Sequence, residues 1–372
     1  MKTWDVIVVG AGSAGAAAAL QHARRGSRVL LVDKRDLSRA GARWVNAVHG
    51  AAFDEAGVAR PVAPELRAVV HRFHLVAGWG PRRLSVASPG VVEVDMGRLV
   101  DRMHADAARA GAELAGGVTV AAIEPGVVRL VGRAPERAPL VVDATGLGGV
   151  FRPEKPAPHD VCAAAQGVYE VRDRDAARRF IGEHGAAPGE TVCFTSVAGG
   201  YSICAVRLEG EDEVSVLTGT LPALGHPSGR ALRDGFVATH RAWIGPMRFG
   251  GHAPIPLHRP RRRLAFVEGR GAGARAVVRI GDAAGQVYAA HGSGVGAQLV
   301  ASAMLADAIA TLGPAGGAAF ERAWHRRFGP KFLVADAFRR LATPLGPRAV
   351  EALVRGGPLT RPLVALSMSA GL

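Results

Sequence analysis

The N-terminus holds the feature that most restricts the fold: a short apolar run, a glycine-rich turn and an Ala-rich segment in direct succession. Asp5–Val9 predicts a buried strand, Gly10–Gly15 a turn, Ser13–Arg25 a helix and Arg28–Val32 a second strand. A strand, a crossover helix and a second strand of these lengths form a βαβ unit with parallel strands. The sequence therefore predicts an α/β fold that begins with its first residues.

The glycines of this turn have the spacing of a dinucleotide-binding fingerprint. Gly10 permits the tight turn, Gly12 lets a pyrophosphate approach the backbone, and Gly15 lets the helix pack closely on the sheet. The N-terminus of the helix offers unpaired N–H groups and a dipole that favours anions. Asp33 ends the second strand, where a carboxylate can accept a hydrogen bond from a ribose hydroxyl. A glycine-rich turn in an unrelated α/β fold would not need all of these parts in this order.

A second glycine-rich segment follows another predicted buried strand, Ala276–Ile280. Gly281–Gly285 reads Gly-Asp-Ala-Ala-Gly, and Gly292–Gly296 then leads into a predicted long helix over Ser293–Leu312. The carboxylate of Asp282 can accept hydrogen bonds from sugar-alcohol hydroxyls, and the helix N-terminus can donate from its free N–H groups. Two such sites, far apart in the sequence, predict one long ligand that is bound at both ends.

The net charge of +14 raises the alternative of a nucleic-acid partner. Lysine occurs at only four positions, so arginine supplies most of the positive charge, and the arginines are spread through every segment. The densest group, Arg259–Arg263, contains no aromatic residue on which bases could stack. A GC-rich coding bias produces such a composition without a functional cause, and we expect no nucleic-acid partner.

Taken together, these segments resemble the FAD-dependent oxidoreductases that include geranylgeranyl reductases, aromatic hydroxylases and flavin-dependent halogenases. Val141–Gly146 is similar to the strand and Ala-Thr-Gly segment that returns to the FAD-binding domain in that superfamily, and 94–113 is similar to the helix before its adenine-contacting strand. Segments 200–201, Pro254–Leu257 and Gly281–Gly294 resemble the geranylgeranyl reductase-like branch most closely. The Trp-x-Trp-x-Ile-Pro signature of the halogenases is absent, which argues against halogenation.

The resemblance implies that the chain binds FAD. The N-terminal glycine motif and Asp33 would bind its ADP half, Gly281 and Asp282 would bind its ribityl chain, and the helix that follows would point at the flavin pyrimidine ring. Arg43 has two interpretations, a phosphate partner or a solvated surface residue. The residues assigned to the cofactor are Gly10, Gly12, Ser13, Ala14, Gly15, Asp33, Lys34, Arg43, Val118, Ala144, Thr145, Gly146, Gly281, Asp282, Gly294 and Val295.

The predicted fold class is α/β, with a Rossmann-like FAD-binding domain interrupted by an antiparallel-sheet substrate domain and followed by a helical C-terminal tail. We expect the FAD-binding domain to comprise 1–68, 96–150 and 270–312, and the substrate domain to comprise 69–95 and 151–269. The C-terminal region, 313–372, is predicted to be helical, with breaks at its prolines.

Three residues are candidates for action on the substrate. His291 precedes Gly292 in the loop that, by the resemblance, passes beside the flavin ring, so its imidazole could donate or accept a proton during hydride transfer. Its alternative is a structural role in shaping the loop. Tyr288 and Tyr201 could line the substrate cavity or lie in the core with satisfied hydroxyls. We expect no metal, because His71 and His74 point to opposite faces of a strand.

The predicted function is that of an FAD-dependent oxidoreductase acting on a largely apolar small molecule by flavin hydride transfer, as a reductase or a dehydrogenase. The alternatives are a flavin monooxygenase that uses NAD(P)H and oxygen and, more remotely, an RNA-binding or RNA-modifying flavoprotein. NADPH or NADH is the expected external reductant. Three cysteines without a CxxC motif fit the reducing cytoplasm. Attachment of the apolar segment Pro358–Leu372 to a membrane surface is possible but not favoured.

Overall fold

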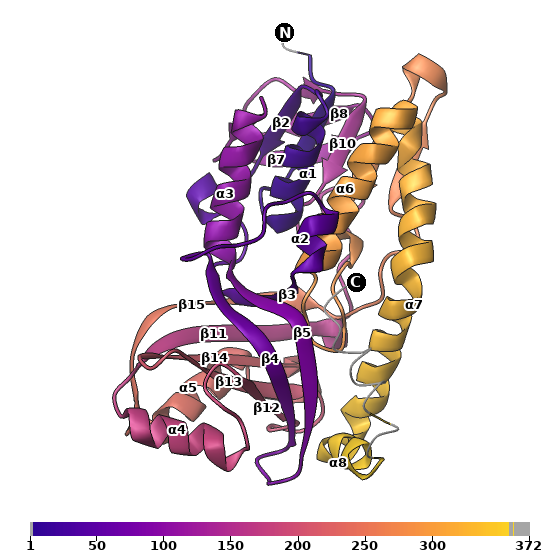
Figure 1. Ribbon diagram of the computed structural model, residues 1–372. Coiled ribbons are helices and arrows are strands. Elements are labelled where there is room, and N and C mark those ends of the chain that lie inside the picture. The colour runs from indigo at the N-terminus through magenta and orange to yellow at the C-terminus, as the bar shows by residue number, and fades with distance from the viewer. Residues whose placement is uncertain (1–2, 357–359, 361–372) are drawn as a thin grey trace.

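The computed structural model has two main parts, one built on a six-stranded sheet and the other on an eight-stranded sheet (Figure 1). The structure describes residues 3–356 and residue 360. The six-stranded sheet and its helices form the upper part of Figure 1, and the eight-stranded sheet forms the lower part. A long helix, α7 (Gly316–Leu345), runs beside both parts.

The six-stranded sheet has the order β16-β17-β10-β1-β2-β6, in which only β16 runs antiparallel to its neighbour. Its strands are β1 (Val6–Val9), β2 (Val29–Val32), β6 (Glu113–Ala115), β10 (Leu140–Asp143), β16 (Ala265–Glu268) and β17 (Arg275–Arg279). Every residue of β1, β2 and β10 is buried, and all but Asp143 are apolar. Such runs are typical of a parallel sheet that is covered on both faces. The predicted α/β class is confirmed.

The two faces of this sheet bury alternate residues of each strand against different layers. Val6 and Val8 pack in the cluster formed with α1 (Ser13–Arg24), α3 (Met96–Arg109) and α6 (Val295–Leu312). Ile7 and Val9 pack on the other face, against a small three-stranded sheet. The strands of that small sheet are β7 (Val120–Glu124), β8 (Val127–Leu130) and β9 (Glu136–Arg137).

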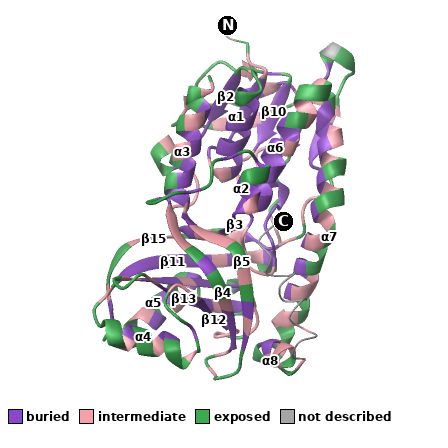
Figure 2. Ribbon diagram, viewed as in Figure 1, coloured by how far each residue is buried: buried purple, intermediate pink, exposed green. Residues whose placement is uncertain are grey.

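Helix α6 is the most apolar helix of the upper part and lies in its interior (Figure 2). Within the described residues, the segment Val295–Leu345 contains a stretch that is long and apolar enough to cross a membrane by length and composition alone. Because 61% of that stretch is buried inside the protein, its hydropathy is that of a core helix.

The eight-stranded sheet has the order β15-β11-β14-β13-β12-β4-β5-β3. Its strands are β3 (Val45–His49), β4 (Leu66–Ala77), β5 (Arg83–Asp95), β11 (Val161–Val171), β12 (Thr191–Thr195), β13 (Ser202–Glu209), β14 (Glu213–Thr220) and β15 (Ile244–Pro256). Neighbouring strands are antiparallel except β12 and β4, which are parallel. Helices α4 (Arg174–Glu183) and α5 (Gly229–Thr239) lie beside it in Figure 1.

One segment that the sequence places in the FAD-binding domain belongs to this second sheet. Residues 41–57 read as mixed and partly helical, within the predicted domain segment 1–68. In the structure β3 pairs with β5 along its whole length, and only the short helix α2 (Ala51–Glu55) follows. The chain therefore passes from one sheet to the other at β3, before the predicted boundary.

The prediction that Pro330 breaks the C-terminal helix is wrong, because α7 continues through it. The helix does end at Leu345, one residue after Pro344. Four aromatic residues at four-residue spacing, Phe320, Trp324, Phe328 and Phe332, are all buried and hold the helix against the core. Their packing outweighs the one hydrogen bond that a proline removes. Pro347 then begins α8 (Pro347–Arg355). The segment Pro358–Leu372, considered above for membrane attachment, lies outside the described residues apart from Thr360.

Three of the four arginines in the densest basic group of the sequence make side-chain contacts within the protein. Arg259 pairs with Asp336 at 2.6 Å, and Arg261 pairs with Glu154. The guanidinium of Arg263 lies 4.4 Å from the centre of the Phe266 ring. These three arginines therefore do not form an unpartnered basic patch.

Replacing Phe328 by alanine tests the role of the aromatic row in holding α7. Phe328 is fully buried, so Phe328→Ala should lower the free energy of unfolding by about 3–5 kcal/mol. Leu341→Ala on the same helix is the control, because Leu341 is 68% exposed and its loss should change stability by less than about 0.5 kcal/mol. Urea unfolding followed by circular dichroism measures both. Equal effects of the two variants would contradict this packing.

Candidate active site

The glycine-rich turn after β1 is packed so tightly that two of its glycines admit no side chain. Gly10 has a φ of +100°, and a Cβ on it would lie 2.3 Å from the carbonyl oxygen of Ala144. A Cβ on Gly15 would lie 1.7 Å from the carbonyl oxygen of Gly10. The turn, the first turn of α1 and the end of β10 are therefore in direct contact, which requires glycine at both positions.

Gly12 is glycine for a different reason. It is the N-cap of α1, and no side chain caps this helix. A Cβ on Gly12 would meet the Cα of Gly41 at 3.5 Å, which is an ordinary contact, and its φ of −70° is open to any residue. The fold therefore does not require glycine at this position, whereas a phosphate that binds the uncapped N–H groups does.

Asp33 lies where a ribose would sit beside this turn. One carboxylate oxygen accepts from the N–H of Ala11 and the other from the N–H of Arg35, each at 2.8 Å. An ionised carboxylate can accept about four hydrogen bonds, so two sugar hydroxyls can still bind. Val118 donates its N–H to the carbonyl oxygen of Asp33, which places it at the predicted adenine end, and Lys34 is exposed.

The second glycine motif contacts the first one directly. A Cβ on Gly281 would lie 2.8 Å from the Cβ of Ala14. The hydroxyl of Ser13 donates to the Oε1 atom of Gln298 at 3.0 Å, and the Nε2 atom of Gln298 donates to Asp282 at 3.1 Å. Two segments more than 250 residues apart are thereby joined through one side chain, which we call the Gln298 bridge.

The N-terminus of α6 completes this arrangement. Gly294 is its N-cap, and no side chain caps the helix. A Cβ on Gly294 would lie 2.3 Å from the carbonyl oxygen of Gln286, so the loop is closely packed, and Val295 is buried. Burial raises the pKa of Asp282, and the hydrogen bond from Gln298 opposes that rise.

The Ala-Thr-Gly segment after β10 is held by a buried carboxylate. Asp143 accepts hydrogen bonds from the backbone and hydroxyl of Thr145 and from the N–H groups of Val150 and Phe151. Gly146 follows with a φ of +83°. The segment therefore has a fixed shape beside Gly10, where the resemblance places it.

Arg43 is engaged by the protein itself. Its guanidinium binds both carboxylate oxygens of Asp101 on α3, each at 3.1 Å. Its side chain is 32% exposed, which does not fit a fully solvated surface residue, and the interpretation as a phosphate partner stays a prediction. The structure places it as a link between the segment before β3 and helix α3.

A cavity of about 220 Å³ lies between the eight-stranded sheet and the C-terminal helices. Strands β4, β5, β13 and β14 supply one wall, and α7 and α8 supply another through Phe338, Ala342 and Val350. The loop that leads into α6 contributes Ala290, His291 and Ser293. The cavity thus adjoins the loop that is predicted to pass beside the flavin.

His291 is on the wall of this cavity. Its Nδ1 atom accepts the N–H of Ser293 at 3.2 Å, so the neutral ring carries its proton on Nε2. Burial lowers the pKa of His291 to about 4, which keeps the ring neutral at neutral pH. The Nε2 atom is buried and has no hydrogen-bond partner among the described residues. It can therefore donate a hydrogen bond into the cavity.

The two tyrosines occupy different positions. Tyr201 lines the cavity just before β13, and burial raises the pKa of its hydroxyl well above the usual value. Tyr288 does not line the cavity, because its ring lies between His291 and Phe332, with centroid distances of 5.4 Å and 4.1 Å. The structure brings His291 and Tyr201 to one cavity and places Tyr288 behind His291.

Several residues of this site carry no motif and were not predicted. Gln298 is a buried amide in the mostly apolar segment Val295–Leu312, and this polarity is the signal that could have revealed it. His104, whose ring lies 2.9 Å from the carbonyl oxygen of Ala11, similarly interrupts the apolar face of α3. Closure of the cavity by α8 has no comparable local signal.

Comparison with known proteins bears on this arrangement. Residues 5–77 match the family described as FAD dependent oxidoreductase. The chain is 25% identical over 376 aligned positions to digeranylgeranylglycerophospholipid reductase of Sulfolobus acidocaldarius, covering 92% of this chain and 78% of that protein. The chain belongs to the FAD-dependent oxidoreductase superfamily. It is an enzyme of that superfamily, and the family match supports FAD as its cofactor.

Solved structures have the same fold. A geranylgeranyl bacteriochlorophyll reductase-like protein from Thermoplasma acidophilum superposes with a TM-score of 0.77 at 17% identity, covering 100% of this chain and 93% of that one. A mutant of the halogenase PltM in complex with FAD superposes with a TM-score of 0.67 at 13% identity, covering 98% and 85%. The fold of this chain is therefore shared by reductase-like proteins and halogenases.

The residues present fit FAD. Gly12 and the uncapped N-terminus of α1 can bind the pyrophosphate, and Asp33 can bind the ribose. Asp282 and the N-terminus of α6, at the other end of the Gln298 bridge, can bind the ribityl chain and the flavin ring. Backbone groups and two carboxylates thus supply the binding atoms.

Replacing Gly12 tests this assignment. Gly12→Val should give a folded protein that retains little or no FAD, because its side chain would occupy the approach of the pyrophosphate, while its Cβ makes only an ordinary contact with Gly41. Gly235→Val in α5 is the control, because a Cβ there meets nothing within 4 Å. The ratio of flavin to protein absorbance measures binding, and circular dichroism measures folding. Normal flavin content in folded Gly12→Val protein would contradict the assignment.

Proposed function

We propose that this enzyme reduces a carbon–carbon double bond of a largely apolar small molecule by hydride transfer from reduced FAD. The observation that carries the proposal is a largely apolar cavity that adjoins the loop before α6. Phe73 and Leu75 of β4, Ile203 of β13, and Leu217 of β14 supply much of its wall. Such a surface favours a hydrocarbon body, because burial of apolar area is the main contribution to its binding.

Bound FAD would supply a hydride donor at the edge of the cavity. The protein contributes position and exclusion of water. Phe338 of α7 and Val350 of α8 cover the cavity, so an apolar substrate is shielded from solvent on this side. His291 can donate its Nε2 hydrogen to a polar atom of the substrate and so fix its orientation. A neutral imidazole is a poor acid, so hydrogen bonding is its proposed role.

The similarity to the Sulfolobus protein supports reduction over other flavin chemistry, because that protein is named a reductase of a digeranylgeranylglycerophospholipid. We infer that a nicotinamide cofactor supplies the electrons through the same cavity. The sequence has no second glycine fingerprint with a following acid that would indicate a separate nicotinamide-binding domain.

Anaerobic reoxidation of the reduced flavin tests the proposal. The purified enzyme is reduced with dithionite and mixed without oxygen with geranylgeraniol, geranylgeranoic acid or digeranylgeranylglycerophospholipid. Return of the flavin absorbance together with a saturated product is the expected result for at least one of them. His291→Phe should slow this step by about tenfold through loss of one hydrogen bond, and His71→Phe, at an exposed position of β4, should not.

Two other outcomes would contradict the proposed reduction. If none of these compounds reoxidises the flavin, and consumption of NADPH or NADH with a hydroxylated product requires oxygen, the enzyme is a monooxygenase. Flavin reduction by the saturated compounds would instead identify a dehydrogenase.

A further inference from the structure

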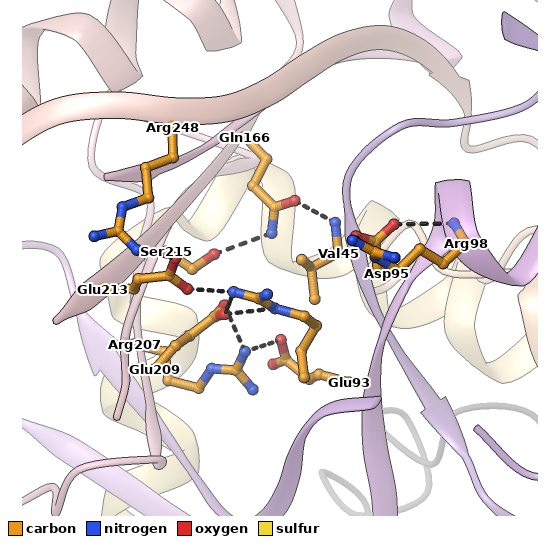
Figure 3. Close-up of polar contacts among 11 residues, drawn as sticks. Val45, Glu93, Asp95, Arg98, Gln166, Arg207, Glu209, Glu213, Ser215 and Arg248 are labelled. Carbon is orange, nitrogen blue, oxygen red and sulfur yellow. Dashed lines mark hydrogen bonds and ion pairs between the residues drawn. The ribbon is translucent and has the colours of Figure 1, made fainter. Parts of the chain in front are cut away.

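Charged side chains line part of the largely apolar cavity. Arg207 on β13 and Glu93 on β5 both reach its wall. Their side chains form an ion pair, and the same Nη2 atom of Arg207 also contacts Glu209 at 2.8 Å (Figure 3). The side chain of Arg207 is only 2% exposed and that of Glu93 is 13% exposed. This charge is therefore inside the protein and beside the proposed substrate.

The cluster lies where β12, the strand between β13 and β4, is too short to pair with the last residues of β13. Strand β12 begins at Thr191, opposite the end of β13, so the last residues of β13 have no β12 partner. Arg67 of β4 bridges this opening by pairing with Glu209 and with Glu213 of β14. Glu213 also pairs with Arg248 of β15, which is 42% exposed.

Arg207 has one donor that the protein does not use. Its Nη1 atom is buried and has no hydrogen-bond partner among the described residues, whereas Nη2 is taken by the two glutamates. A guanidinium is always charged and its buried N–H groups are costly to leave unpaired. Since Arg207 lines the cavity, a ligand in the cavity can supply the missing acceptor.

Glu93 can change its charge near neutral pH. Burial raises its pKa to about 7, because attraction by Arg207 and Arg67 does not outweigh burial and repulsion by Glu209. Other titratable groups near this wall are Glu213 of β14, His291, which is neutral at this pH, and Tyr201 and Cys193, whose pKa values are raised by burial. Since the folded-state pKa lies above the ordinary 4.5, stability falls as pH rises from about 4.5 through about 7.

The cluster lies close to the loop beside the flavin. Glu93 is paired in the sheet with Ala47 of β3, and the carbonyl oxygen of Ala47 accepts the hydroxyl of Ser293 at 3.2 Å. The amide of Gln166 bridges the N–H of Val45 and the hydroxyl of Ser215 (Figure 3). A ligand held by Arg207 therefore occupies the same cavity as the proposed reaction.

We propose that Arg207 and Glu93 bind the carboxylate of a substrate whose apolar body lies along β4, β13 and β14, so that this enzyme selects monoanionic, fatty-acid-like molecules. The carboxylate accepts a hydrogen bond from Nη1 of Arg207 and one from the protonated carboxyl of Glu93. Binding above the pKa of Glu93 then takes up one proton from water. The statement that the ligand is a substrate rests on the proposed function. The statement that this site binds a carboxylate does not.

A carboxylate fits better than a phosphate because the site offers one free guanidinium donor and one group that can gain a proton. A phosphate dianion would add a second negative charge close to Glu209 and Glu213, whose carboxylates are already shared with Arg67 and Arg207. A neutral alcohol or ester would not supply the negatively charged acceptor that Nη1 of Arg207 lacks.

Calorimetric titration of the flavoprotein with decanoate tests the proposal. The expected result is binding with uptake of up to one proton, which is seen as a difference between buffers of unequal ionisation enthalpy. The affinity should fall by up to about tenfold per pH unit between about pH 7 and pH 8.5, because Glu93 loses its proton there. Decanol and methyl decanoate should bind more weakly and without proton uptake.

Variants separate the two side chains. Arg207→Lys and Arg207→Met should each weaken decanoate binding by about ten- to a hundredfold and leave decanol binding unchanged. Glu93→Gln should keep decanoate binding and remove both the proton uptake and the pH dependence. Arg248→Met is the matched control, because this arginine belongs to the same network but does not line the cavity. Flavin content and melting temperature report whether each variant is folded.

Three outcomes would overturn the inference: equal affinity for decanoate and decanol, no proton uptake by the unaltered protein, or tighter binding of decyl phosphate than of decanoate. The titration needs no turnover. Decanoate binding without any double-bond reduction would reject the proposed function alone, and reduction of neutral compounds only would reject the carboxylate site alone.

Discussion

The close packing of the glycine turn on the end of β10 is the constraint on which the active site depends. With Gly10 and Gly15 in contact with each other and Gly10 in contact with Ala144, the N-terminus of α1 is fixed relative to the sheet. The Gln298 bridge then links Ser13 to Asp282, so the start of α6 is fixed to the same turn. Two helix N-termini with no side-chain caps are thereby held in one site. Most of the anion recognition comes from backbone geometry, and little of it from the net charge of +14.

The parts of the fold that depend on local patterns could be predicted from the sequence. Continuous apolar runs specify β1, β2 and β10, and the glycine spacing specifies the turn that follows β1. Helix α7 could not be predicted in full, because Pro330 is a strong local signal and the packing of Trp324 and Phe328 that overrides it is tertiary. β3 was missed for a similar reason, since its partner residues in β5 lie 42 to 50 positions later.

The residues of the candidate site likewise fall into those that the local sequence predicts and those that only the folded structure brings together. The glycines and Asp33 were predictable because each has a role defined by its neighbours in the chain. Arg207 and Glu93 were not predictable, because neither lies in a motif and they meet only when the eight-stranded sheet closes the cavity. In a chain with so many arginines, composition also gives no reason to select one. Burial and an unused donor distinguish Arg207, and both are properties of the folded protein.

A crystal structure of the flavoprotein with FAD bound tests the central claim most directly. We expect the pyrophosphate at the backbone of Gly12 and Ser13, the ribityl chain at Asp282, and the flavin ring between the N-terminus of α6 and the cavity that contains His291. A pyrophosphate held chiefly by arginine side chains, or a flavin ring that does not reach this cavity, would contradict the account.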